Sequence, residues 1–207
     1  MVYWTQWFFG RLIELMGHIF YKLSFEGLEY LKECDLPVIF VSNHKSWIDH
    51  FIIIAGALRR NNVVPIHVLV ADDIYSRPII GAVCKLLGAY PARYKTGLDV
   101  SLAPLIQELR EGECVGLYPE GKINRGYNEF WPPRPGAAWL ANTTHRQIFP
   151  MAIRGLENFS WPSLFFSRRK ITISYGRPLY LDKSLSIEES SDKIMATIVA
   201  LYQSISS

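Results

Sequence analysis

The chain has 207 residues, of which 49% are apolar and 14% aromatic, and its formal net charge is +3 at pH 7. This length suits one domain with a sizeable core, and the composition excludes a disordered chain. The mild charge gives no indication of a nucleic-acid partner, and we expect none. The three cysteines are too widely spaced to form metal-ligand pairs, so reduced thiols are expected.

Residues Val2 to Leu23 have the pattern of an amphipathic helix. Its polar residues recur on one stripe at helical spacing, and its apolar residues lie away from that stripe. The stripe consists of Arg11, Glu14, His18 and Lys22. These charges disfavour a membrane-spanning segment, which needs about 20 mostly apolar residues. The segment also lacks the basic start and the cleavage site of a signal peptide.

The front of this helix is rich in bulky aromatic residues, namely Trp4, Trp7, Phe8 and Phe9. Such residues suit the headgroup boundary of a membrane. Two interpretations stay open: the helix lies at a membrane interface, or it packs on the protein core. We therefore divide the chain into an N-terminal amphipathic helix, residues 1–24, and a second unit, residues 25–207.

After a link at residues 25–28, predicted strands alternate with predicted helices. The strands are expected at residues 37–42, 63–70, 88–93, 113–118, 148–154 and 170–175. The helices are expected at residues 48–60, 74–87, 99–112, 136–142 and 186–204, with Pro78 at a helix start or a kink. This alternation predicts an α/β fold in which helices flank a sheet.

The most informative stretch runs from Val38 to His50. An apolar run rich in β-branched residues ends at Asn43-His44, and an apolar helix begins near Ile48. Histidine suits proton transfer near neutral pH. Asp49 can fold back to bind one ring nitrogen of His44, which leaves the other nitrogen facing a cleft. Taken alone, this spacing is more often that of an ordinary turn histidine.

Three loops at strand ends carry polar residues that a core does not need. The first holds His44 and Asp49, the second holds Arg93, and the third holds Glu120, Gly121, Lys122 and Arg125. Sites in open α/β sheets form where such loops converge. A base with an orienting carboxylate, together with nearby cations, suits activation of a hydroxyl group on a molecule that carries a phosphate. Arg93 and Lys122 as plain surface charges remain an alternative.

Together these loops resemble the glycerophospholipid acyltransferase family, and in particular its lysophosphatidic acid (1-acylglycerol-3-phosphate) acyltransferases. That family shares a His-x4-Asp block, a glycine-to-arginine block, a Pro-Glu-Gly block and a proline-containing strand. The matching blocks here are residues 43–49, 88–93, 118–121 and 148–153. Arg134-Pro135-Gly136 also resembles the basic-x-Gly helix start of the family. The blocks occur in the order and with the spacing of the family.

The resemblance implies a mixed central sheet like that of glycerol-3-phosphate acyltransferase. It also implies acyl transfer without a covalent enzyme intermediate. His44, held by Asp49, would take the proton of the free hydroxyl of a lysophospholipid, and the oxygen would attack the thioester of acyl-CoA or acyl-carrier protein. The acceptor would be lysophosphatidic acid, and the product phosphatidic acid. Backbone N–H groups around the His44 loop are expected to stabilise the oxyanion.

The same resemblance assigns substrate-binding roles and a location. The residues expected to bind the phosphate and glycerol of the acceptor are Arg93, Glu120, Gly121, Lys122 and Arg125. Glycine at 121 would let the backbone come close to the ligand. No metal or tightly bound cofactor is implied, because the thioester is a co-substrate. The protein would be peripheral or monotopic on the cytoplasmic face of a membrane.

The third block departs from the pattern of the family. Where the family continues Glu-Gly with Thr-Arg-Ser, this chain has Lys122-Ile123-Asn124, so the arginine position is apolar. Lys122 or Arg125 can supply the lost charge. Glu-Gly-Lys followed by an aliphatic residue and Asn is closer to the tafazzin branch, which moves acyl chains between phospholipids and lysophospholipids without a thioester. A transacylase therefore remains an alternative.

Two further function classes compete with this interpretation. A metal hydrolase could use His44, Asp49, His50 and His67, but no His-Glu-x-x-His pattern exists, and His44 and His50 do not share a helix face. A non-catalytic lipid-binding module of the same fold is the other class. The intact His44, Asp49, Glu120 and Gly121 disfavour that class, because a decayed enzyme is expected to lose such residues.

Overall fold

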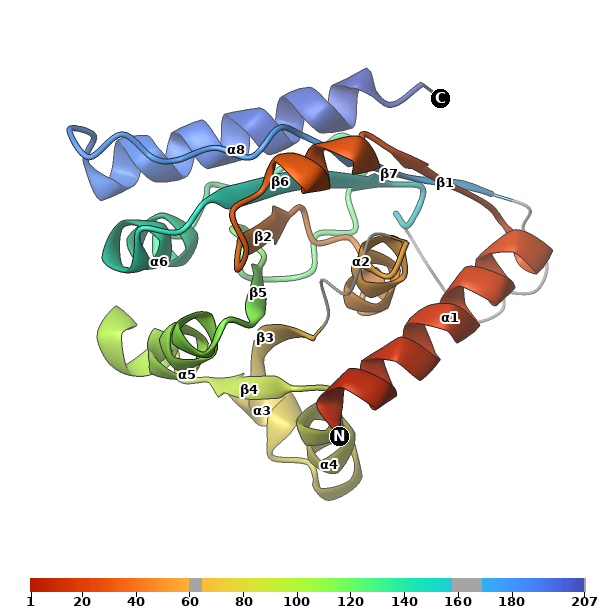
Figure 1. The fold of residues 1–207 in the computed structure, drawn as a ribbon, viewed down its shortest axis with the longest axis horizontal. Coiled ribbons are helices and arrows are strands. Elements are labelled where there is room, and N and C mark those ends of the chain that lie inside the picture. Colours follow the sequence, from red (N-terminus) through yellow and green to blue (C-terminus); the bar gives the residue numbers. More distant parts are fainter. Residues whose placement is uncertain (60–64, 158–168, 207) are drawn as a thin grey trace.

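The structure is a computed structural model that describes residues 1–59, 65–157 and 169–206. Its centre is a seven-stranded sheet with the order β1-β7-β6-β2-β5-β3-β4 (Figure 1). Neighbouring strands run parallel, except that β6 and β7 are antiparallel. Helices cover both faces of the sheet. The predicted single α/β domain with a mixed central sheet is confirmed.

The strands agree with the predicted ones to within a few residues, and one strand was not predicted. Their bounds are β1 Lys22–Glu26, β2 Ile39–Ser42, β3 Ile66–Ala71, β4 Ala89–Ala92, β5 Cys114–Leu117, β6 Ile148–Arg154 and β7 Lys170–Tyr175. Both β6 and β7 have the predicted bounds. The start predicted for the second strand, at residues 63 and 64, lies outside the described residues. The central strand β2 is buried throughout, as expected where helices cover both faces.

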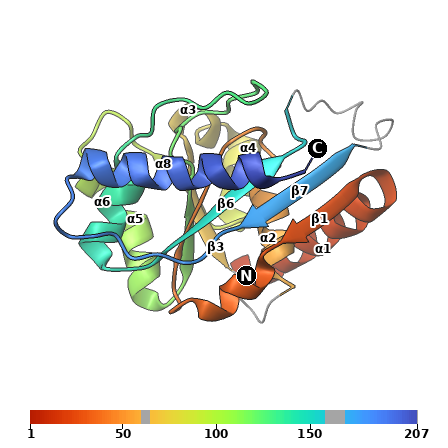
Figure 2. The same cartoon turned by 90° about the horizontal axis from the view of Figure 1, so that it is seen from above.

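The helices form two layers. Their bounds are α1 Val2–Phe20, α2 Asp49–Ala57, α3 Asp72–Tyr75, α4 Pro78–Leu86, α5 Leu98–Glu111, α6 Gly136–Thr144 and α8 Ile187–Ser204, with a 3-10 turn at Leu28–Glu33. One core cluster joins α1 and α2 to the sheet, and another joins α5, α6 and α8 to its opposite face. Figures 1 and 2 show these layers on the two sides of the strands.

The N-terminal helix ends at Phe20, before the predicted end at Leu23, and the unpredicted strand β1 follows it at once. Tyr21 is already extended, with φ −130° and ψ 166°. The next residues pair in parallel with β7, where Lys22 lies opposite Lys170. Helical spacing of apolar residues continues into β1. The helix nevertheless ends there, because a strand far away in the sequence supplies the hydrogen bonds.

Several helix boundaries also differ from those predicted. The helix expected at 74–87 is two helices, and Pro78 lies in the first turn of the second, where its missing N–H costs no helical hydrogen bond. α5 begins after Gly97 instead of at Asp99. α2 ends at Ala57 instead of Arg60, and Arg60 itself lies outside the described residues.

The parallel strands place the three candidate loops at one edge. β2, β5, β3 and β4 all point in the same direction, so their carboxyl ends lie at the same edge of the sheet. We call this edge the carboxyl edge. The loops that carry His44, Glu120 and Arg93 follow β2, β5 and β4, and therefore all begin there.

Candidate active site

His44 and Asp49 form a hydrogen-bonded pair at the carboxyl edge. His44 follows β2, and Asp49 is the first residue of α2. The Nδ1 atom of His44 lies 2.9 Å from Oδ2 of Asp49. The predicted contact between ring and carboxylate is therefore confirmed. Because Nδ1 faces Asp49 and the His44 side chain is 19% exposed, Nε2 is the nitrogen left for a substrate.

The carboxylate of Asp49 is fully buried and is held by the loop that it closes. Its Oδ2 atom accepts from the backbone N–H groups of Lys45 and Ser46, at 2.7 and 2.9 Å, and its Oδ1 atom accepts from the Ser46 hydroxyl at 2.8 Å. These donors offset the loss of water around the carboxylate. The orientation of the His44 ring is thus fixed by a rigid partner.

A tyrosine stacks on the histidine. The ring of Tyr118, just after β5, lies parallel to that of His44, with 4.0 Å between centroids and 14° between planes. The Tyr118 hydroxyl is buried without a hydrogen-bond partner in the described structure, and burial raises the pKa of this phenol well above its usual value. Tyr118 therefore covers one face of the imidazole and is not placed to exchange protons near neutral pH. Sequence reasoning did not identify this role.

Glu120 lies beneath the histidine loop. It is buried, and its Oε1 atom accepts from the backbone N–H of His44 at 3.2 Å. Its Oε2 atom accepts from the Asn124 side chain at 2.8 Å and from the backbone N–H of Trp131 at 3.2 Å. Both oxygens of Glu120 are therefore engaged by the protein itself. This geometry suits support of the His44 loop, whereas the sequence led us to expect contact with substrate.

These contacts also bear on the oxyanion. The sequence led us to expect that backbone N–H groups of this loop stabilise it. In the structure the N–H of His44 donates to Glu120, and those of Lys45 and Ser46 donate to Asp49. These three groups are thus occupied and are not free to bind an oxyanion in this conformation. Their occupation could not be predicted, because the burial of Glu120 depends on the whole fold.

Lys45 was not singled out from the sequence, yet its side chain is fully buried beside His44. Its Nζ atom donates to the backbone carbonyls of Gly126 and Glu129, at 2.9 and 2.8 Å, and lies 4.9 Å from the centre of the Phe130 ring. Desolvation lowers the pKa of Lys45 from its usual value. A lysine after a strand ordinarily indicates an exposed position, so no local pattern predicts this burial.

Two asparagines connect the histidine loop to distant segments. Asn43 is buried and exchanges two hydrogen bonds with the backbone of Ile153 in β6, at 2.8 and 2.7 Å. The backbone N–H of Asn124 donates to the carbonyl of His44 at 2.7 Å, and its side chain donates to the carbonyl of Glu129 at 3.1 Å. His44 is thereby held from both sides. The first, third and fourth sequence blocks meet at this point.

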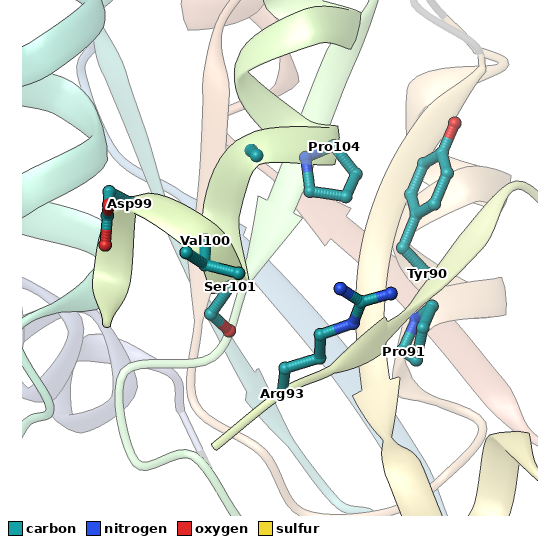
Figure 3. Close-up of a pocket in the computed structure, with 8 residues that line it drawn as sticks. Tyr90, Pro91, Arg93, Asp99, Val100, Ser101 and Pro104 are labelled. Carbon is teal, nitrogen blue, oxygen red and sulfur yellow. The ribbon is translucent and has the colours of Figure 1, made fainter. Parts of the chain in front are cut away.

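The predicted cations are placed differently. Arg93 follows β4 and is exposed, and its guanidinium points into a pocket of about 440 Å³ between β4 and the first half of α5 (Figure 3). Lys122 and Arg125 are exposed in the loop after Gly121. Within residues 1–59, 65–157 and 169–206, none of these three side chains forms a hydrogen bond or an ion pair.

Arg93 follows a strand that is not adjacent to the strand before His44. Its strand, β4, is three places from β2 in the sheet, which corresponds to roughly 14 Å between strand axes. The residues that line its pocket come from β4, the loop after it and α5. The structure thus brings His44, Asp49, Glu120 and Gly121 together and leaves Arg93 at the far end of the same edge.

The remaining histidines have separate environments. The Nδ1 atom of His67 lies 2.9 Å from the carbonyl oxygen of Gly88. Both ring nitrogens of His50 are buried without a partner among the described atoms, and desolvation lowers the pKa of His50 to about 4. In the part of the chain that the structure describes, no group of three His, Cys, Asp or Glu side chains is arranged to hold a metal ion.

Comparison with curated proteins gives several relatives. A chloroplastic 1-acyl-sn-glycerol-3-phosphate acyltransferase of Brassica napus is 23% identical over 181 residues, which are 84% of this chain and 50% of that protein. The 1-acyl-sn-glycerol-3-phosphate acyltransferase of Bacillus subtilis is 25% identical over 183 residues, 86% of each protein. This chain spans about half the length of the Brassica relative.

A solved structure shares the fold. The 1-acyl-sn-glycerophosphate acyltransferase PlsC from Thermotoga maritima superposes with a TM-score of 0.75 at 17% identity, over 100% of this chain and 80% of that one. The sequence profile of the family described as Acyltransferase matches residues 22–154, well over half of the chain. This range includes the His44–Asp49 pair and the Glu120–Gly121 turn. The chain therefore belongs to the acyltransferase family.

Proposed function

We propose that this protein moves a fatty acyl chain from a thioester donor, acyl-CoA or acyl-carrier protein, to the free hydroxyl of lysophosphatidic acid. The product is phosphatidic acid. The observation that carries the proposal is the His44–Asp49 pair, which leaves Nε2 of a partly exposed imidazole at the carboxyl edge. The relatives named as 1-acyl-sn-glycerol-3-phosphate acyltransferases support the choice of acceptor.

The reaction needs one base and no covalent enzyme intermediate. Nε2 of His44 takes the proton of the acceptor hydroxyl while its oxygen attacks the thioester carbonyl. The tetrahedral intermediate then expels the thiolate, which takes the proton from the imidazolium. The buried carboxylate of Asp49 stabilises the imidazolium between these two steps and keeps the ring oriented. The stacked Tyr118 restricts movement of the ring.

Positive charge at the carboxyl edge suits an anionic acceptor. Arg93, Lys122 and Arg125 bind the phosphate and glycerol region in this proposal. Their side chains are exposed and, in the described structure, unpaired, so no internal ion pair must be broken before a phosphate binds. Glu120 contributes by fixing the backbone of His44, and Gly121 by forming the tight turn next to it.

The outer face of α1 suits a membrane surface. Its inner face is anchored, because the side chain of buried Gln6 donates to the backbone of Ile66 and Leu87, at 2.9 and 2.8 Å. Its outer face exposes Trp4, Trp7, Phe8, Leu12, Leu15 and Ile19. We propose that this face lies in the membrane interface on the cytoplasmic side. None of the described helices has the length and hydropathy of a membrane-spanning segment.

A transacylase is the second candidate. The observation that favours it is the run Lys122-Ile123-Asn124, in which Ile123 takes the place of an arginine. Asn124 is buried and tied to Glu120 and to His44, so this variation belongs to the architecture of the site. In this alternative an intact phospholipid replaces the thioester as donor, and the His44–Asp49 pair keeps its role.

One assay separates these candidates. Labelled acyl-CoA and a panel of lysophospholipids are presented in mixed micelles to the wild type and to His44→Ala. Product from the wild type alone, and fastest with lysophosphatidic acid, supports the proposal. Exchange of label from an intact phospholipid without any thioester-dependent product supports the transacylase. If a folded wild type is inactive in both arms, the enzyme proposal fails and a lipid-binding module becomes the better explanation.

A further inference from the structure

The side chain of Arg134 lies against the turn at Gly121, which belongs to the third sequence block. Gly121 has a left-handed backbone with φ of 68°, and a Cβ atom added to it would lie 2.4 Å from both Cδ and Nε of Arg134. The side chain of Arg134 therefore passes directly over the Gly121 turn. Any residue larger than glycine would displace it. The third block has Ile123 where the family has an arginine. Arg134, which comes just before α6, places an arginine beside this block.

Arg134 is held in place at both ends. Its backbone N–H donates to the carbonyl of Pro119 at 2.8 Å. Its guanidinium carbon lies 5.3 Å from the centre of the Tyr94 ring, in the loop after β4. Arg134 is exposed, and in the described residues its guanidinium has no hydrogen bond or ion pair with another side chain. Its donors are therefore oriented and free.

Position along the carboxyl edge favours Arg134 over Arg93 as the cation closer to the reaction. The hydroxyl and the phosphate of lysophosphatidic acid are only a few covalent bonds apart, whereas β2 and β4 are separated by roughly 14 Å. Arg134 touches Gly121, and the neighbouring Glu120 binds the backbone of His44. Arg134 is therefore linked to the His44 loop through the Glu120–Gly121 turn.

We propose that Arg134 binds the phosphomonoester group of the acceptor beside the third block, which has Ile123 at its arginine position. Its planar fork can donate two parallel hydrogen bonds to phosphate oxygens. Tyr94 and the Gly121 turn fix the fork, so little side-chain freedom is lost on binding. This inference rests on the proposed function for the identity of the acceptor. Coenzyme A also carries a phosphomonoester, and the test must separate the two sources.

The test measures initial rates of wild type and Arg134→Gln against acceptor concentration and, separately, against donor concentration. We expect the KM for lysophosphatidic acid to rise about ten- to a hundredfold in Arg134→Gln, because a charge-assisted contact is lost. The donor KM should not change, and kcat should change far less than KM. Adding Ile123→Arg to Arg134→Gln should recover much of the acceptor KM, which would support a shared position for the phosphate.

A binding measurement makes the test independent of turnover. Titration calorimetry compares a short-chain lysophosphatidic acid with the monoacylglycerol of the same chain length. Arg134→Gln should weaken binding of the first ligand and leave binding of the second unchanged. If neither protein has transferase activity, the proposed function fails, while the titration still decides whether Arg134 binds a phosphomonoester.

The matched control is Arg110→Gln. Arg110 is exposed in the last turn of α5, and its removal changes the net charge by the same amount. An unchanged acceptor KM and unchanged affinity in a folded Arg134→Gln protein would overturn the proposal. A rise confined to the donor KM would overturn it in favour of the phosphate of coenzyme A. An equal effect of Arg110→Gln would overturn it in favour of general attraction to anionic micelles.

Discussion

The two ends of the carboxyl edge are built differently. At one end, His44, Asp49 and Glu120 lie in a network in which nearly every polar atom is buried and hydrogen-bonded. At the other end, Arg93 is exposed and its side chain is unpaired in the described structure. Proton transfer requires fixed geometry, whereas an anion-binding residue must keep its donors free for the ligand. The difference predicts distinct effects of mutation at the two ends.

The largest effect is expected at the histidine. His44→Ala should lower kcat about 10²–10⁴-fold, since the proposed mechanism uses His44 as its general base. The protein should stay folded, because Asp49 keeps its hydrogen bonds from the Lys45 and Ser46 backbone when the ring is removed. Acyl-transfer rates and denaturant unfolding check this, with His145→Asn, on an exposed residue after α6, as the control. Full activity in a folded His44→Ala protein would refute the mechanism.

Removal of the buried ammonium tests whether the network supports the histidine. Lys45→Met should leave the carbonyls of Gly126 and Glu129 without their donor and lower the free energy of unfolding by about 2–4 kcal/mol. Turnover should fall as well, because the loop that carries Asn124 loosens beside His44. Urea unfolding measures the first effect. Lys45→Arg, which keeps the charge, is expected to lose less; equal stability of Lys45→Met and wild type would contradict the assigned role.

His50, which follows Asp49 in α2, should also make the stability of the protein depend on pH. Burial lowers the pKa of His50 from 6.5 to about 4, so between these values the unfolded chain binds a proton that the folded protein does not. The His50 contribution to the free energy of unfolding is therefore complete above pH 6.5 and decreases as the pH falls towards 4, by up to about 3 kcal/mol. Urea unfolding at several pH values should show a shallower dependence for His50→Leu. Parallel curves would contradict this.

The smallest effect is expected at the open end. Arg93→Ala should raise the acceptor KM by an amount equivalent to about 1.5–3 kcal/mol, through a lost contact with the phosphate, and leave stability unchanged. Glu120→Gln tests the buried end in the same assay. Because Glu120 holds the His44 loop, this substitution should lower kcat more than it alters KM. Steady-state kinetics of both variants provide the measurement. An unchanged KM in Arg93→Ala would remove Arg93 from the site.

Sequence patterns predicted those features that depend on neighbouring residues. The period of the apolar residues located most helices and strands, including β6 and β7, because each element is encoded by its own stretch of chain. The contact between His44 and Asp49 was predictable for the same reason, since a strand, a turn and a helix start bring the two together within a few residues. β1 was missed because its partner, β7, is remote in sequence.

Only the tertiary structure decided which polar side chains are buried and which are free. Glu120, Lys45 and Asn43 acquire their partners from segments far along the chain, and nothing in their local sequence indicates this. The position of Arg134 over Gly121 likewise depends on how the loops after β4 and β5 meet. The sequence by itself determined the α/β order and the contact between His44 and Asp49. Contacts across the carboxyl edge determined what surrounds that pair, because burial and hydrogen bonding are properties of the assembled fold.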